Sequence, residues 1–421
     1  PKAHVARMLL GWGRKTVRRL VTVGPRLFWG GTTLARLGRG DEPFSAVEVG
    51  PDEAAAILFT SGSTGAPKGA VYTHGIFTAQ VEMLRSAYGI EPGEIDLPTF
   101  PLFALFDPAL GMTAVLPEMD FTRPAHVDPG KIIGPIRKHG ITNMFGSPAL
   151  LRRVAGDAEL PTLKRVISAG APVSPDVLER FTRMLAPGAE VHTAYGATES
   201  LPVSTIGSEE ILGDTAAGTR QGRGVCVGRP LMGLSVSILK ITDEPIEEWS
   251  EELRVERGEV GEIAVSGPVV TQAYFNRPES TALAKIAGRN GDVIHRMGDL
   301  GYFDDKGRLW FCGRKSQRVV LEKETLYTIP CEGVFNAHPM VHRTALVGVA
   351  GKPVLCVEME GRPRCNSHEL AKQLLELGAR CPHTAAISTI LIHRGSFPVD
   401  IRHNAKIFRE KLATWAARRV S

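Results

Sequence analysis

The chain has 421 residues, 43% of them hydrophobic and 23% charged, which is enough for two or more domains with a sizeable core. Fifty Lys and Arg against 45 Asp and Glu give a net charge of only +5, too weak and dispersed to indicate a nucleic-acid partner. The six cysteines form neither a Cys-x-x-Cys pair nor a zinc-finger spacing with histidine, and no stretch has the length of a membrane span. These features predict a cytoplasmic protein with free thiols.

The first predicted element is a basic amphipathic helix over residues 5–23. Apolar residues such as Met8 and Leu20 alternate there with basic residues such as Arg14 and Arg18. A helix of this kind can lie on a membrane surface or receive an acidic partner. We prefer the simpler interpretation of a surface helix with a solvated basic face. Residues 24–52 are predicted to form a connecting loop.

The most informative stretch is the polar, glycine-rich segment 60–69. It follows the apolar run 54–59, which has the length of a buried strand, and it precedes a helical pattern over 77–88. The expected order is therefore strand, loop, helix. Glycines, several hydroxyls and the ammonium group of Lys68 together are typical of a cradle for a polyphosphate, with a solvated linker as the alternative. The loop is not a Walker A motif, because a glycine follows Lys68 where Ser or Thr is required.

Short apolar runs then alternate with helical patterns. Residues 97–108 read as a strand that ends in an aromatic loop, where Phe100, Phe103 and Phe106 either fill the core or line an apolar acyl pocket. A helix, two strands and a second helix are expected at 132–136, 141–145, 165–168 and from Pro175 onward. This alternation predicts a parallel sheet covered on both faces, with ligands beyond the carboxyl ends of its strands. Segment 60–69 and residues 168–172 both fall at that edge.

Another polar cluster, residues 195–200, follows a short strand predicted at 190–193. It contains Thr198, whose hydroxyl can bind a phosphate oxygen, and Glu199, whose carboxylate can hold Mg²⁺. A Thr-Glu pair is commonplace, so a simple turn remains the alternative for this cluster.

From residue 225 the pattern changes to short Val- and Ile-rich strands broken by Gly and Pro, which predicts an antiparallel subdomain. A hairpin is expected between residues 297–303 and 308–314. It carries Asp299 on one strand and Arg314 at the end of the other. A carboxylate can accept from both hydroxyls of a ribose, so this pair either holds a ribose or is a surface ion pair.

In their order and approximate spacing, these motifs resemble those of the adenylate-forming superfamily, which includes acyl-CoA synthetases, nonribosomal peptide adenylation domains and firefly luciferase. The resemblance runs from about residue 54 to the end and adds Asn404-Ala405-Lys406 as its last motif. It implies an α/β fold with a large domain of layered parallel sheets and helices over 1–315, an antiparallel barrel-like subdomain over about 222–315, and a small, mobile α+β domain over 316–421. The family carries a long further segment before its phosphate loop, so the front of the fold is expected to be missing.

The resemblance implies ATP and Mg²⁺ as cofactors. The glycine-rich loop would grip the β- and γ-phosphates, residues 169–172 would flank the adenine, Tyr195 would stack on it, and Asp299 and Arg314 would hold the ribose. The implied cofactor-binding positions are Thr60, Ser61, Gly62, Ser63, Thr64, Gly65, Lys68, Gly170, Ala171, Pro172, Tyr195, Gly196, Asp299 and Arg314.

The resemblance assigns catalysis to Lys406, Thr198 and Glu199, with Glu199 as the metal ligand. Thr198 would meet the α-phosphate, and Lys406 would reach the bond that forms between a substrate carboxylate and the α-phosphorus. A lysine in a polar loop before a helix at 408–419 is usually just solvated, so this role of Lys406 depends on the resemblance. Because negative charge spreads over phosphate oxygens in the transition state, positioned cations would contribute most of the catalysis.

The chain departs from the family pattern at two places. The hinge of the small domain falls at Ser316, where the family usually has Asp or Lys. Members that use coenzyme A follow the hinge with a glycine-rich turn, whereas residues 319–330 contain no glycine. Side chains in place of bare backbone are expected to obstruct a thiol channel, which argues against a thioester product.

Within the superfamily, residues 298–302, 310–315, 327–332 and 398–406 look most like the OleC group of bacterial olefin biosynthesis. Members of that group are ATP-dependent β-lactone synthetases that act on long-chain 2-alkyl-3-hydroxy acids. The implied partners are thus a small-molecule β-hydroxy fatty acid and sister enzymes of a hydrocarbon pathway. The alternatives are a long-chain acyl-CoA synthetase or acyl-AMP ligase, and a catalytically silent nucleotide-binding scaffold. Intact Lys68, Glu199 and Lys406 argue against the silent scaffold.

Overall fold

The structure is a computed structural model that describes residues 2–37, 45–60, 67–289, 291–361, 366–399 and 406–420. The chain divides into two compact units, Pro1–Val49 and Gly50–Ser421, and each is described by itself. In the first unit two short parallel strands, β1 and β2, accompany two helices. The bounds are α1 Lys2–Leu10, β1 Val21–Thr22, β2 Thr32–Thr33 and α2 Leu34–Leu37. None of the helices in the described ranges combines the length and apolar character needed to cross a bilayer.

The core of the first unit is the ring of Trp29. It is 4% exposed, stacks on His4 with ring centroids 5.1 Å apart, and donates from Nε1 to Thr22 Oγ1 at 3.1 Å. The prediction of one helix over residues 5–23 is wrong, because α1 ends at Leu10. Gly11 and Gly13 follow with φ of +67°, a backbone conformation that no right-handed helix can continue.

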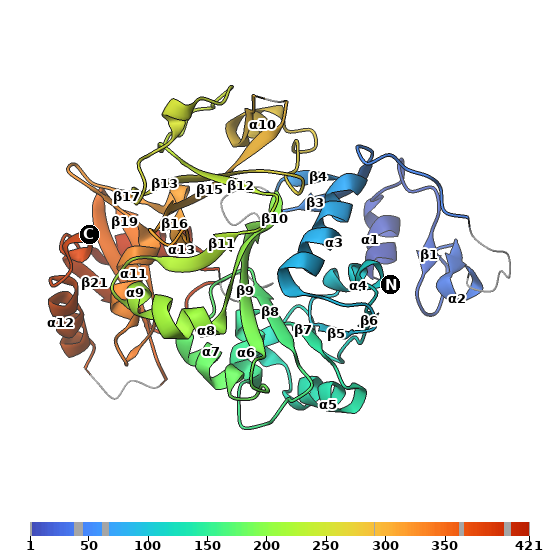
Figure 1. The fold of residues 1–421 in the computed structure, drawn as a ribbon, viewed down its shortest axis with the longest axis horizontal. Helices are drawn as coiled ribbons and strands as arrows, with labels where there is room; N and C mark the ends of the chain where they lie inside the picture. The colour runs from blue at the N-terminus through green and yellow to red at the C-terminus, as the bar shows by residue number, and fades with distance from the viewer. Residues whose placement is uncertain are drawn as a thin grey trace. The chain divides into compact units, whose positions relative to one another are not determined.

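The second unit is built on one 12-stranded sheet with the strand order β12-β13-β15-β16-β11-β10-β9-β8-β7-β5-β6 and with β14 paired to β15 (Figure 1). The strands of this sheet that come first in the chain form a parallel region, as the alternating pattern predicts. It runs from β6 through β5, β7 and β8 to β9. These strands are β5 Ile95–Pro98, β6 Thr113–Ala114, β7 Asn143–Phe145, β8 Arg165–Ala169 and β9 Glu190–Ala197.

Helices cover both faces of this parallel region. Side chains of a strand alternate between the faces, so Val166 of β8 joins one core while the adjacent Ile167 packs in another. The Val166 face is covered by α5, α6 and α7, and the Ile167 face by α3 and α4. Figure 1 shows α3 on one side of β8 and β9 and α6 and α7 on the other. The helices are α3 His74–Tyr88, α4 Asp107–Leu110, α5 Gly130–His139, α6 Pro148–Val154 and α7 Pro175–Thr182.

The glycine-rich segment joins two strands. It closes an antiparallel hairpin of β3 Ala54–Phe59 and β4 Gly69–Thr73, and α3 begins only after β4. The predicted order of strand, loop and helix therefore missed one strand. The apolar run of β3 is also not buried, because each of its residues is exposed or half-buried.

The antiparallel region continues the same sheet through β10, which pairs with β9 on one side and β11 on the other. The predicted hairpin exists as β15 and β16, and their register places Asp299 opposite Arg314. The bounds are β10 Ser200–Gly207, β11 Val225–Pro230, β12 Ser235–Leu239, β13 Gly261–Ser266, β14 Lys285–Ala287, β15 Val293–Phe303 and β16 Leu309–Arg314. Short helices α8 Ser208–Glu210, α9 Ala216–Arg220 and α10 Pro278–Ala284 lie in its connections.

The C-terminal part is a small α+β domain, as expected. Its three-stranded sheet pairs β19 with β20 antiparallel and β20 with β21 parallel. Helices α11 and α12 cover one face and α13 the other, because Leu346 and Leu355 point to one core and Ala345 and Val354 to the second. The elements are β17 Val319–Val320, β18 Thr325–Leu326, α11 Thr328–Asn336, β19 Val341–Val349, β20 Lys352–Met359, α12 Ser367–Gly378, β21 Thr389–Ile392 and α13 Arg409–Val420.

Candidate active site

The neck of the glycine-rich loop is closed by two hydrogen bonds between Thr60 and Lys68. The Thr60 amide donates to the Lys68 carbonyl at 2.9 Å, and the Lys68 amide donates to Thr60 Oγ1 at 3.1 Å. The Thr60 hydroxyl thereby helps to fix the point where Lys68 leaves the loop. The predicted positions Ser61, Gly62, Ser63, Thr64 and Gly65 lie outside the described residues.

Lys68 and Glu199, 131 positions apart in the chain, meet at the ring of Tyr274. The Lys68 Nζ lies 5.1 Å from the centroid of that ring, and the Tyr274 hydroxyl donates to Glu199 Oε1 at 2.5 Å. Tyr274 is 5% exposed, and burial together with the charge of Glu199 raises the pKa of its hydroxyl, so it stays a donor. Tyr274 was not predicted as a site residue, because it stands in a segment without a recognisable pattern.

One extended segment ties the loop hairpin to the Thr198–Glu199 turn. The Val71 amide on β4 donates to the Ala273 carbonyl at 3.1 Å, and the Thr271 amide donates to the Glu199 carbonyl at 2.9 Å. The hydroxyl of Tyr72, also on β4, donates to the Thr198 carbonyl at 2.6 Å. The two polar motifs predicted from the sequence are therefore held in one frame.

A buried ammonium group supports this frame from inside the protein. Lys285 on β14 is 8% exposed, and its Nζ donates to the Thr271 carbonyl and lies 3.2 Å from Thr271 Oγ1. Burial lowers the pKa of Lys285 to about 7, and the negative charge of Glu199 opposes that shift. A single lysine in a short strand gives no signal in the sequence, which is why it was missed.

Tyr195 on β9, Asp299 on β15 and Arg314 on β16 form a second cluster. Strands β15 and β16 pair directly, whereas β11 and β10 lie between β16 and β9 in the sheet. The Tyr195 hydroxyl donates to Asp299 Oδ2 at 2.7 Å, and Arg314 Nη1 lies 3.0 Å from Asp299 Oδ1. Asp299 is 3% exposed, and its Oδ1 has no aligned hydrogen-bond donor among the described residues despite this ion pair. A buried carboxylate oxygen with spare acceptor capacity fits a ligand hydroxyl, such as those of a ribose.

Lys406 acts on the same cluster electrostatically. Burial raises the pKa of Asp299, whereas the charge of Arg314, the hydrogen bond from Tyr195 and the charge of Lys406 all lower it. Lys406 is half-buried, and residues 400–405 of its predicted loop lie outside the described part of the chain. The structure thus brings the ammonium group of Lys406 within electrostatic reach of Asp299.

The segment predicted to flank an adenine leaves the sheet beside Tyr195. Strand β8 ends at Ala169, which pairs with Ala194 of β9, and Gly170 follows with φ of +93°. Gly170, Ala171 and Pro172 are exposed or half-buried at this edge. Gly196 admits no side chain, because a Cβ there would stand 2.8 Å from the Ser200 carbonyl oxygen.

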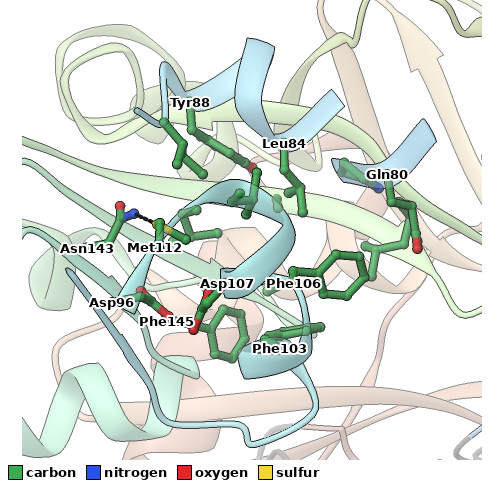
Figure 2. A pocket seen from close by; sticks show the side chains of 17 residues that line it. Gln80, Leu84, Tyr88, Asp96, Phe103, Phe106, Asp107, Met112, Asn143 and Phe145 are labelled. Atoms are coloured by element: carbon green, nitrogen blue, oxygen red, sulfur yellow. Dashed lines mark hydrogen bonds between the residues drawn. The ribbon is translucent and has the colours of Figure 1, made fainter. Parts of the chain in front are cut away.

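A cavity of about 100 Å³ opens between α3, α4 and the ends of the parallel strands (Figure 2). Phe103 and Phe106 line it, whereas Phe100 packs on Phe103 with ring centroids 5.2 Å apart. Two of the three phenylalanines therefore border a cavity, and its use as an acyl pocket stays a prediction. The lining also contains two aspartates, Asp96 and Asp107, which the sequence analysis did not single out.

The described residues hold no group of three or more His, Cys, Asp or Glu side chains placed to bind a metal ion. Glu199 alone would fit Mg²⁺ bound largely through phosphate oxygens and water, which is how this ion commonly binds in nucleotide sites. Of the cysteines, Cys226, Cys312, Cys331 and Cys356 are buried free thiols and Cys381 is partly exposed.

Comparison with known proteins places the chain in a family. The family model described as "AMP-binding enzyme" matches residues 13–275. An olefin beta-lactone synthetase of Stenotrophomonas maltophilia is 52% identical over 99% of this chain and 77% of its own length. A protein of the same name from Xanthomonas campestris is 50% identical with the same coverage.

Solved structures share the fold at lower sequence identity. The amide bond synthetase McbA from Marinactinospora thermotolerans superposes with a TM-score of 0.78 at 24% identity, over 98% of this chain and 78% of that one. The o-succinylbenzoate coenzyme A synthetase MenE from Bacillus subtilis, in complex with AMP, gives a TM-score of 0.69 at 24% identity, over 86% and 69% of the two chains. The chain therefore belongs to the AMP-binding, adenylate-forming enzyme family and groups within it with the olefin beta-lactone synthetases.

Proposed function

We propose that the protein is an ATP-dependent β-lactone synthetase that acts on a 2-alkyl-3-hydroxy acid. The strongest support is the identity of 52% and 50% over 99% of the chain to two olefin beta-lactone synthetases. The geometry adds two contacts: Lys68 lies over the ring of Tyr274, whose hydroxyl donates to Glu199, and the charge of Lys406 acts on Asp299.

In the proposed first step a carboxylate oxygen of the acid attacks the α-phosphorus of ATP. A new oxygen–phosphorus bond forms while the bond to the bridging oxygen breaks and pyrophosphate leaves. Lys406 would hold the incoming carboxylate against the α-phosphate, and Thr198 would donate to an α-phosphate oxygen. Lys68 would hold the outer phosphates, because its ammonium group emerges from the closed neck of the glycine-rich loop.

Nucleotide recognition is proposed for the second cluster. The acceptor capacity that Asp299 Oδ1 keeps among the described residues suits a ribose hydroxyl, and the charge of Arg314 lowers the pKa of that carboxyl against the larger effect of burial. Mg²⁺, bound by Glu199 and phosphate oxygens, would neutralise part of the phosphate charge. The Tyr274 hydroxyl and the Thr271 amide orient Glu199 for that role.

In the proposed second step the 3-hydroxyl oxygen of the same molecule attacks the acyl carbon. The bond from that carbon to the AMP oxygen breaks, a four-membered ring closes and AMP leaves. An intramolecular nucleophile needs no thiol acceptor, which agrees with the absence of glycine from residues 319–330. The cavity beside α3 would take one alkyl branch, because its lining is mostly apolar.

The proposed boundary between the large and the small domain lies at the proposed hinge residue Ser316, which is in a short 3₁₀ turn after β16. Residues 316–421 would move as a unit so that Lys406 approaches the site for adenylation.

Sister enzymes of a hydrocarbon pathway are the proposed protein partners.

Incubation with ATP, Mg²⁺ and a racemic 2-alkyl-3-hydroxy acid, with and without coenzyme A, tests the proposal. We expect AMP, pyrophosphate and a β-lactone, with no dependence on coenzyme A. An acyl-CoA product that needs coenzyme A would instead indicate an acyl-CoA synthetase. A stable acyl-AMP as the end product would indicate an acyl-AMP ligase, and ATP binding without pyrophosphate release would indicate a silent scaffold.

A further inference from the structure

The cavity beside α3 has two ends, which differ in their distance from the proposed nucleotide site. Asp96 and Asp107 lie next to each other at one end, and Gln80 lies at the opposite end (Figure 2). The strand register places Asp96, because it pairs with Asn143, which pairs with Arg165 at the start of β8. The aspartates therefore mark the end that is farther from the carboxyl edge of the parallel strands, where a nucleotide is expected.

Gln80 belongs to the end beside the proposed nucleotide site. Its amide nitrogen donates to the carbonyl of Leu201, the second residue of β10, at 2.8 Å. Leu201 follows closely on the Thr198–Glu199 turn. The cavity lining also includes Ala169, the last residue of β8, and its partner Ala194 on β9. The side chain of Gln80 is thus fixed at the edge of the sheet that carries the proposed nucleotide contacts.

Two neighbours orient the amide group of Gln80. Its nitrogen donates to the Leu201 carbonyl and hydrogen-bonds with the hydroxyl of Tyr72, whose own proton goes to the Thr198 carbonyl at 2.6 Å. Both contacts require a donor from Gln80, so the nitrogen occupies this side and the oxygen points away from it. Burial raises the pKa of Tyr72 to about 12, so its hydroxyl keeps the proton that this arrangement needs.

The oxygen of this amide is a buried acceptor without a donor. Gln80 is 4% exposed, and its Oε1 has no hydrogen-bond partner among the described residues. Buried polar atoms are almost always paired, and Gln80 lines the cavity, so the missing donor is expected from a ligand in it. Asp107 Oδ2 also lacks a partner within the described ranges. Because it lies at the far end of the cavity, the two oxygens cannot bind the same group of a ligand.

A 2-alkyl-3-hydroxy acid has a single hydrogen-bond donor to offer. Its ionised carboxylate only accepts, its alkyl branches are apolar, and its 3-hydroxyl carries the polar hydrogen. One carbon atom separates the carbon that bears this hydroxyl from the carboxyl carbon that would bond to AMP. The donor must therefore lie at the nucleotide end of the cavity, where Gln80 Oε1 is an acceptor without a partner among the described residues.

Resting on the function proposed above, we infer that Gln80 Oε1 accepts a hydrogen bond from the 3-hydroxyl of the substrate and of its acyl-adenylate, and thereby selects 3-hydroxy acids. This hydrogen bond holds the hydroxyl oxygen at the nucleotide end of the cavity, where it attacks the acyl carbon. An amide oxygen does not take up a proton at neutral pH, so Gln80 orients the nucleophile and is not its general base.

The test compares two acids in wild type and variants. The acids are a 2-alkyl-3-hydroxy acid and the same acid without its 3-hydroxyl. Gln80→Met keeps the length of the side chain without the amide, and pyrophosphate release measures kcat/KM for adenylation. We expect wild type to prefer the hydroxy acid by about 3- to 10-fold, the effect of one neutral hydrogen bond, and Gln80→Met to lose this preference. Gln221→Met, at an exposed glutamine, is the matched control and should keep it.

The ratio between the two acids separates substrate recognition from a structural effect. Gln80→Met also leaves the Leu201 carbonyl without its donor, which would slow the adenylation of both acids alike. Single-turnover closure of preformed acyl-adenylate is a second measurement. Closure should slow by about 10- to 100-fold in Gln80→Met, because the hydroxyl loses its orientation toward the acyl carbon.

A measurement on the wild-type protein keeps the inference testable if the variant does not fold. Fluorine in place of the 3-hydroxyl is polar but donates no hydrogen bond, so the 3-fluoro acid should be adenylated no faster than the acid without the hydroxyl. Adenylation of the 3-fluoro acid as fast as the hydroxy acid would overturn the inference, as would an unchanged preference for the hydroxy acid in Gln80→Met. A wild-type protein that makes no lactone from the hydroxy acid would instead remove the proposed function.

Discussion

The hydrogen bond from Tyr195 to Asp299 offers a sharp test of the proposed ribose site. Tyr195→Phe removes only the hydroxyl that donates to Asp299 Oδ2 at 2.7 Å, and the ring can keep its packing on Phe311, whose centroid lies 6.0 Å away. That hydroxyl is one of the groups that favour the charged form of Asp299 against burial. Without it the pKa of Asp299 should rise further.

The size of the effect follows from the chemistry of the pair. A hydrogen bond to a charged group contributes about 1.5–3 kcal/mol, which corresponds to about 1–2 pH units for the pKa of Asp299. Because the pKa of Asp299 is already raised in the folded protein, the stability linked to this group is complete below its unfolded pKa and is lost as the pH rises through its folded pKa. The variant should therefore lose almost no stability in acid and progressively more as the pH rises, up to about 1.5–3 kcal/mol once Asp299 is charged in both folded proteins.

Calorimetric measurement of ATP affinity from pH 5.5 to 8.5 would detect the same rise in the pKa of Asp299. The charged carboxylate is the form that accepts from a ribose, so affinity should begin to fall at a higher pH in Tyr195→Phe than in wild type. Tyr302→Phe is a matched control, since that hydroxyl donates to the neutral Arg223 carbonyl at 3.0 Å. Identical pH profiles of ATP affinity in Tyr195→Phe and wild type would refute the placement of the ribose at Asp299.

Three further outcomes are expected. Lys406→Ala should lose most adenylate formation, measured by pyrophosphate release, and keep ATP binding, measured by calorimetry. Near-normal pyrophosphate release would refute the catalytic role of Lys406. Arg409→Met should lower the free energy of unfolding by about 3–5 kcal/mol in denaturant titrations, because it leaves the buried carboxylate of Glu332, which Arg409 contacts at 2.5 and 2.9 Å, without its partner. The exposed Arg418→Met is the control. Equal losses of stability in the two variants would contradict this role of Arg409. Gly196→Ala should raise the KM for ATP, since its Cβ would lie 2.7 Å from Leu201 Cδ1. Gly213→Ala is the control, because its Cβ would meet no atom within 4 Å, and it should leave the KM for ATP unchanged.

Much of the fold could be predicted because local patterns decided it. Alternation of apolar runs and helical periodicity fixed the parallel strands β7 and β8 and the helix after Pro175. The strand β4 was missed because residues 69–73 begin with a glycine and lack a long apolar run. The first helix was overextended because the apolar pattern of residues 5–23 continues past two glycines whose positive φ ends the helix.

The residues of the proposed site fall into two groups: those that a local motif indicates and those that only tertiary contacts reveal. Lys68, Glu199, Asp299 and Arg314 stand in local motifs, so the sequence indicated them, although their shared location required tertiary contacts. Tyr274 and Lys285 are recognisable only through the contacts that they make.

The most direct test of the central claim follows an isotope from the acid into AMP. The 2-alkyl-3-hydroxy acid is labelled with oxygen-18 at both carboxylate oxygens, and the products are analysed by mass spectrometry. Attack of the carboxylate on the α-phosphorus predicts one labelled oxygen in the phosphate of AMP and one in the lactone carbonyl. Unlabelled AMP, or label in pyrophosphate, would contradict activation of the carboxylate as an acyl-adenylate.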